Sequence, residues 1–158
     1  MNSGLHHASV ATRDHDLLVD FLESALGLGR IATVTVPRSE VAALFGWPDG
    51  EGTIRSSIVG SGRHGLLEVV DVPDAVDGRP GPVTAGVFQL SFAVSDVAEF
   101  LRRAAGCGAD AVTGPRTVDV GGAAIEVGVV DIAGLRLQVT QGPGARRGPE
   151  RKEVRGYQ

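Results

Sequence analysis

The stretch His7-Ala8-Ser9-Val10-Ala11-Thr12-Arg13-Asp14 decides the fold, because its pattern recurs as Gln89-Leu90-Ser91-Phe92-Ala93-Val94-Ser95-Asp96. In both copies, a short run of alternating residues ends shortly before an aspartate. Such alternation predicts a strand, and an aspartate after it is a suitable N-cap for a following helix. A second match, between Leu67-Glu68-Val69 and Leu137-Gln138-Val139, closes each copy. The sequence therefore predicts two diverged copies of one structural unit.

Outward from these stretches, each copy reads as strand, helix, strand, strand, strand. In the first copy we expect strands over residues 5–12, 30–36, 53–59 and 65–72, and helices over 14–26 and 39–45. Asp14 is the expected N-cap of the first helix and Gly27 its stop. In the second copy we expect strands over residues 87–94, 111–120, 123–131 and 134–140, and a helix over 96–105.

These units divide the chain into module one (4–73), a linker rich in Pro and Gly (74–86) and module two (87–141). Together they form one expected domain, 4–141, which suits a chain of 158 residues. The remaining segment, 142–158, is basic and lacks apolar periodicity. We expect this tail to be disordered and to carry no function.

Composition excludes several classes of function. The net charge is -4, with no basic block in the periodic region, so we expect no role in nucleic-acid binding. No apolar run approaches the about 20 residues that a membrane span needs, and we expect no membrane partner. The single cysteine cannot form an internal disulfide, and the first residues lack the features of a signal peptide. The expected location is the cytoplasm.

Alternation also separates the two faces of the strands. On the strand over 87–94, Leu90 and Phe92 share an apolar face, while Gln89 and Ser91 share a small, polar one. His7, Ser9 and Ala11 lie together in the same way on the first strand, and Arg136, Gln138 and Thr140 on the last. Several strands therefore offer polar side chains to one surface. A curved sheet whose outer face is covered by helices leaves its inner face either exposed to water or occupied by a ligand.

Two βαβββ units in tandem, each opening on a strand that leads into a helix, resemble the vicinal oxygen chelate superfamily. This superfamily includes glyoxalases, bleomycin-resistance proteins and extradiol dioxygenases, and the resemblance spans residues 4–141. It implies an α+β fold in which two tandem modules form a curved, eight-stranded mixed sheet, a half-barrel with helices on its outer face. It also implies one divalent metal on the concave face. The corresponding ligand positions, on the first and last strands of each module, are His7, Glu68, Gln89 and Gln138.

The two glutamines depart from the family pattern. Amide oxygens are weaker donors than carboxylates, so the expected site binds metal less tightly and less selectively. Gln89 also argues against the dioxygenase branch, which needs two histidines and one carboxylate. In the branches that abstract a proton next to a carbonyl, a last-strand glutamate commonly supplies the base, and Gln138 cannot do so. Glu68 is then the expected catalytic base, with His7 as a nearby acid, base or ligand.

The resemblance implies an enzyme acting on a small carbonyl-containing metabolite, as an isomerase, epimerase or lyase, with or without a divalent metal. The alternative is a metal-free binding protein that sequesters a drug, as bleomycin-resistance members do. A homodimer is implied in either case. Further residues are candidates for contacts with the substrate: Ser9, Ser91, Arg55, Ser57, Arg136 and Trp47. For each candidate the alternative is a purely structural role, as a paired polar group in a sheet or, for Trp47, as a side chain that fills the core.

Overall fold

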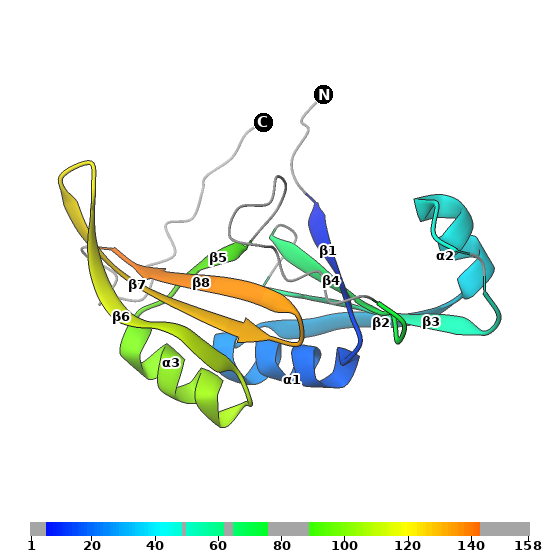
Figure 1. The fold of residues 1–158 in the computed structure, drawn as a ribbon, viewed down its shortest axis with the longest axis horizontal. Helices are drawn as coiled ribbons and strands as arrows, with labels where there is room; N and C mark the ends of the chain where they lie inside the picture. Colours follow the sequence, from blue (N-terminus) through cyan, green and yellow to red (C-terminus); the bar gives the residue numbers. More distant parts are fainter. Residues whose placement is uncertain (1–5, 49, 62–64, 76–88, 143–158) are drawn as a thin grey trace, which may run out of the picture.

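The computed structural model describes residues 6–48, 50–61, 65–75 and 89–142 (Figure 1). Module one contains β1 (His7–Thr12), α1 (His15–Leu26), β2 (Gly29–Pro37), α2 (Arg38–Phe45), β3 (Thr53–Gly60) and β4 (Leu66–Asp71). Module two contains β5 (Leu90–Ala93), α3 (Val97–Gly106), β6 (Asp110–Val120), β7 (Ala123–Ile132) and β8 (Leu135–Gln141). The predicted order of strands and helices is confirmed, with small shifts at the ends of elements. The expected linker and tail lie almost wholly outside the described residues.

The strands form two mixed sheets of four, in the orders β1-β4-β3-β2 and β5-β8-β7-β6. In each sheet the first strand of the module pairs parallel with the last, and the other pairs are antiparallel. The repeat extends to the register, because Ser9 lies opposite Glu68 in one sheet and Ser91 opposite Gln138 in the other. The two tandem modules and the α+β class are therefore confirmed, and the eight strands are divided between two hydrogen-bonded sheets.

Local signals place the two longer helices at equivalent points of the modules. Asp14 caps α1 by accepting a hydrogen bond from the backbone of Leu17, and Asp96 caps α3 in the same way. Gly27 ends α1 in the left-handed conformation, with a φ of 69° that favours glycine. Both helices lie beneath the sheets (Figure 1). The short helix α2 lies apart from them, at the far end of module one (Figure 1).

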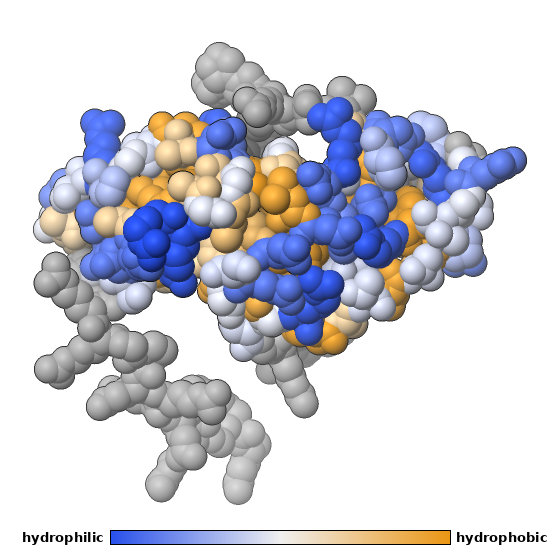
Figure 2. All heavy atoms as spheres, turned by 90° about the horizontal axis from the view of Figure 1, so that it is seen from below, coloured by the Kyte–Doolittle hydropathy of each residue, from blue (hydrophilic) through white to orange (hydrophobic). Residues whose placement is uncertain are grey.

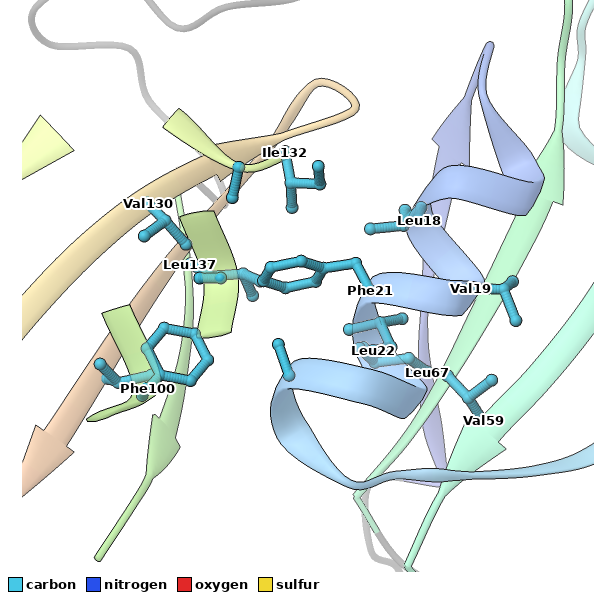
Figure 3. Packing of buried hydrophobic residues seen from close by; sticks show 14 of the residues in the cluster. Leu18, Val19, Phe21, Leu22, Val59, Leu67, Phe100, Val130, Ile132 and Leu137 are labelled. Carbon is cyan, nitrogen blue, oxygen red and sulfur yellow. The ribbon is translucent and has the colours of Figure 1, made fainter. Parts of the chain in front are cut away.

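One hydrophobic core joins the two modules. Its fully buried side chains come from α1, α3 and the central strands of both sheets. Phe21 of α1 points across towards Leu137 of β8 (Figure 3). Its ring also meets that of Phe100 from α3 edge to face, with centroids 6.3 Å apart. Thr12 adds a polar link, donating a hydrogen bond of 3.0 Å to the carbonyl of Ala133. Each module thus completes the core of the other.

The outer, helix-covered side carries hydrophilic side chains over much of its surface, with apolar areas between them (Figure 2). No helix among the described residues is long and apolar enough to cross a membrane. The face of interest for function is the opposite one, where the polar sides of β1 and β4 are exposed.

Candidate functional site

A polar cluster surrounds the carboxylate of Glu68 on β4. Ser9 of β1 donates a hydrogen bond of 2.5 Å to Oε2, and Ser56 of β3 donates one of 2.8 Å to Oε1. Nε2 of His7 lies 3.5 Å from Oε2. The carboxylate side chain keeps 23% of its surface exposed, so it is oriented by protein donors and still accessible. This arrangement holds one carboxylate in a fixed direction beside an imidazole.

Strand pairing explains why these residues meet. Ser9 is the direct parallel partner of Glu68, and His7 is two residues away, on the same face of β1. Ser56 pairs with Val70, which is two residues from Glu68 on β4, so Ser56 reaches the carboxylate diagonally. The cluster therefore follows directly from the register of three neighbouring strands.

The cluster forms one end of a pocket of about 480 Å³. Its polar lining consists of His7, Ser56, Glu68 and Glu40. The rest of its lining is apolar and comes from β2, α2, β3 and β4: Val34, Val36, Val41, Leu44, Phe45, Ile54 and Val70. The volume lies within the range of about 300–1,000 Å³ that is typical of sites for small molecules. The site can therefore take an apolar molecule and present it to Glu68.

The other two predicted metal ligands meet each other in the second sheet. The side-chain amide of Gln89 donates a hydrogen bond to the side-chain oxygen of Gln138. Within residues 6–48, 50–61, 65–75 and 89–142, no three His, Cys, Asp or Glu side chains are grouped closely enough to hold a metal ion. One imidazole, one carboxylate and two mutually bonded amides fit a divalent metal poorly, because amide oxygens are weak donors.

Ser57 and Arg55, both predicted to contact substrate, lie outside the pocket lining. Ser57 is fully buried and bonds to Nε2 of His15 at 3.0 Å and to Thr33 at 2.8 Å. His15, the first residue of α1, is only 2% exposed. Its Nδ1 lies 3.2 Å from Oδ1 of Asp16, and since a carboxylate only accepts, the imidazole donates there.

Serine, imidazole and carboxylate follow one another here in the order of a catalytic triad. Ser57 has no exposed surface, so a substrate cannot reach its hydroxyl. We therefore assign this buried chain of hydrogen bonds to stability. It ties the first turn of α1 to the central strand β3, directly behind Ser56. Arg55 extends the network by bridging Asp16 at 3.0 Å and Asp71 at 3.1 Å.

This network predicts an acid-dependent contribution to stability. The hydrogen bond from His15, followed by that from Arg55, holds the pKa of Asp16 below its ordinary value. A lowered pKa in the folded state stabilises the protein above the ordinary pKa of the unfolded chain, and this contribution is lost as the pH falls through the lower value. Asp16→Asn should therefore unfold at lower denaturant concentration than the parent at pH 7, and the difference should shrink below about pH 4. A difference that grows on acidification would contradict this assignment.

The remaining candidates for substrate contact are scattered. Arg136 forms a two-pronged ion pair with Asp131, with distances of 2.9 and 2.8 Å. Ser91 lies exposed on β5, opposite Gln138. The ring of Trp47 packs beside Phe45, with centroids 5.4 Å apart, and supports the pocket wall from behind. Of the predicted residues, only His7 and Glu68 line the pocket, and Ser9 bonds to Glu68.

Sequence reasoning missed Ser56 and the wall formed by α2. Strand alternation could have identified Ser56, because it places Ser56 and Ser57 on opposite faces of β3. The α2 residues Glu40, Val41, Leu44 and Phe45 carried no comparable signal. Their role depends on where a helix sits above a sheet, which periodicity does not specify.

The geometry agrees with comparisons to known proteins. The sequence model of the Glyoxalase/Bleomycin resistance protein/Dioxygenase superfamily matches residues 4–139. The chain belongs to this superfamily. No curated protein matches the sequence. The match covers both modules, including the polar cluster around Glu68 and the amide pair.

Solved structures of the superfamily share the fold at low sequence identity. A glyoxalase family protein from Bacillus cereus has a TM-score of 0.72 at 20% identity, covering 90% of this chain and 97% of that one. Glyoxalase I from Zea mays has a TM-score of 0.58 at 15% identity, covering 86% of this chain and 45% of that one. TioX from Micromonospora sp. ML1 has a TM-score of 0.53 at 24% identity, covering 89% of this chain and all (100%) of that one. These likenesses establish the fold.

Proposed function

We propose that this chain is an acid/base enzyme that moves a proton next to the carbonyl of a small molecule, as an isomerase or epimerase. The observation that carries the proposal is the position of Glu68. Its carboxylate is oriented by Ser9 and Ser56 and lines a pocket whose walls are mainly apolar. A carboxylate in such surroundings is a suitable base, and the imidazole of His7 beside it is a suitable acid.

The proposed reaction uses these groups in sequence. Glu68 takes a proton from the carbon next to the carbonyl, and the C–H electron pair moves to form an enolate. The imidazole of His7 donates a hydrogen bond from its N–H to the enolate oxygen. Return of a proton to carbon then gives either the other stereoisomer or the shifted isomer. The hydroxyls of Ser9 and Ser56 keep the carboxylate aimed into the pocket while it exchanges its proton. No metal is required for this sequence.

Proton transfer of this kind is testable before the natural substrate is identified. We expect the protein to speed the exchange of hydrogen for deuterium at the carbon next to the carbonyl of uncharged ketones that carry a phenyl ring, such as phenylacetone. The reaction is followed in D₂O by loss of the proton NMR signal. The background rate is measured with the same concentration of heat-unfolded protein. Exchange no faster than this background, across a panel of ketones that bind the pocket, would refute the proposed chemistry.

The apolar lining supports a second candidate function, a metal-free binding protein that sequesters a small molecule. In this case, Glu68 and His7 would only fix the orientation of the ligand. The same assay separates the two functions, since a binding protein takes up ligands by calorimetry yet leaves the exchange rate at background. Phe45 of α2 offers this ligand an exposed ring that can stack against it.

We also propose that two copies of the chain pair as a homodimer. A large apolar side chain outside the pocket lining is exposed on the edge strand β2, that of Ile31, which is 54% exposed. Light scattering should give twice the chain mass of 16.3 kDa, and Ile31→Glu should reduce it to that of one chain. Val112→Glu, on the edge strand β6, is the matched control. A single-chain mass for the unaltered protein would refute pairing, and loss of the dimer only in the control would place the interface on β6.

A further inference from the structure

The charges around the pocket specify its ligand more closely than its shape does. Two carboxylates, Glu40 and Glu68, line the pocket, and no lysine or arginine appears among the described residues that line it. Glu40 lies in the first turn of α2, on the wall opposite the sheet, while Glu68 lies on β4. A molecule that enters the pocket therefore meets negative charge on two sides.

Arginines on the neighbouring elements pair with acidic side chains outside the pocket. Arg38 of α2 pairs with Asp74, Arg55 of β3 bridges Asp16 and Asp71, and Arg136 of β8 pairs with Asp131. None of these arginines lines the pocket. An anionic ligand would thus place its charge near two carboxylates without a compensating cation from these residues. Like charges brought together in a partly desolvated site repel strongly, so this pocket disfavours carboxylates and phosphates.

We infer that the ligand of this pocket is an organic cation with an apolar body: a molecule carrying a protonated amine whose hydrocarbon part lies between α2 and the sheet. The inference rests on the proposed function only in using the same pocket. Val34, Leu44 and Phe45 are about half exposed or more and provide the surface for the apolar body. Burial of that body favours binding roughly in proportion to the area removed from water. The amine pairs with the carboxylates by charge-assisted hydrogen bonds.

The test uses three probes with one apolar body and different charge: phenylbutylamine, phenylbutanol and phenylbutyrate. Affinities are measured by isothermal titration calorimetry on the full chain. Trp47, the only tryptophan of the chain, packs beside Phe45 and against the pocket residues Ile54 and Val70, so its fluorescence reports binding at this site. We expect the amine to bind at least about tenfold more tightly than the alcohol, and the carboxylate to bind most weakly. Equal affinities, a preference for the carboxylate, or no binding of the amine would overturn the inference.

Two variants locate the charge effect. Glu40→Gln should weaken binding of the amine several-fold while leaving the affinity for the alcohol unchanged. Glu126→Gln makes the same change of charge in a separate cavity of module two, and should leave both affinities as they are. If the two variants weaken amine binding equally, the preference comes from the overall charge of the protein and the inference fails.

These outcomes are distinct from those of the proton-exchange assay. Selective binding of the amine, with exchange of ketone protons at the background rate, would leave the ligand class standing and remove the enzymatic proposal. Fast exchange together with affinities that do not depend on ligand charge would support the enzymatic proposal and overturn the inferred ligand class.

Discussion

Phe21→Ala should lower the free energy of unfolding by about 3–5 kcal/mol, the usual cost of truncating a buried phenylalanine. The ring is fully buried and lies where the two modules meet, with Phe100 at its edge and Leu137 in front of it (Figure 3). Its loss opens a cavity that helices and strands of both modules border. Since domains of this size are stable by about 5–15 kcal/mol, the variant should lose a large part of the stability of the parent.

Phe45→Ala is the matched control, because it removes the same ring from a position that is 53% exposed. Its free energy of unfolding should change by less than about 1.5 kcal/mol, because the half-exposed ring loses mainly its contact with Trp47. Both variants are measured by denaturant unfolding followed by circular dichroism. The parent should unfold in one transition, because the modules share a core. Two separate transitions, or a cost for Phe21→Ala below about 1 kcal/mol, would contradict this account of the core.

Glu68→Gln should reduce the rate of proton exchange at bound ketones by about 10²–10⁴-fold, the usual contribution of a positioned general base. The amide has nearly the same shape as the carboxylate and can still bond to Ser9 and Ser56, but it cannot take a proton. Ketone affinity should therefore change little. The effect is measured by proton NMR in D₂O at saturating ketone, so that it reports the chemical step.

Gln138→Ala is the control, since Gln138 occupies the equivalent position on the last strand of module two. Exchange should continue at the rate of the parent, because the proposed chemistry lies wholly in module one. A loss of exchange in this variant, with Glu68→Gln active, would move the reacting centre to the second sheet. Equal loss in both would indicate that the two modules act together on one ligand.

Most of the fold could be predicted from the sequence because local patterns, strand alternation and helix caps, occur at matching positions in both copies. Asp14 caps α1 as predicted, and Asp96, its match in the second copy, caps α3. The match of Glu68 with Gln138 is likewise reproduced in the register of both sheets. The division of eight strands into two sheets was not predictable in this way, since no local pattern determines whether the edge strands of two modules bond to each other.

The site was only partly predictable, for a related reason. Alternation places His7 and Ser9 on one face of β1, the family resemblance adds Glu68, and the structure places the three in contact. The sequence shows that Arg55 is charged but does not show its partners, and in the structure it pairs with Asp16 and Asp71. Glu40 was not identified, because its distance from the sheet depends on how the loops before and after α2 direct that helix.

The shared core has a consequence for how the chain is made. During synthesis on the ribosome, β1 emerges well before β4 and has no parallel partner until β4 has been synthesised. The face of α1 that bears Phe21 stays uncovered for longer still, until β7 and β8 near the end of the chain have been synthesised. Contacts between distant parts of a sequence form slowly, and an uncovered apolar helix face attracts other chains. A ribosome that stalls after module one therefore presents a nascent chain with an uncovered apolar helix face, which is prone to aggregation. Chaperones that shield apolar surfaces should matter most for this protein while module two is being translated.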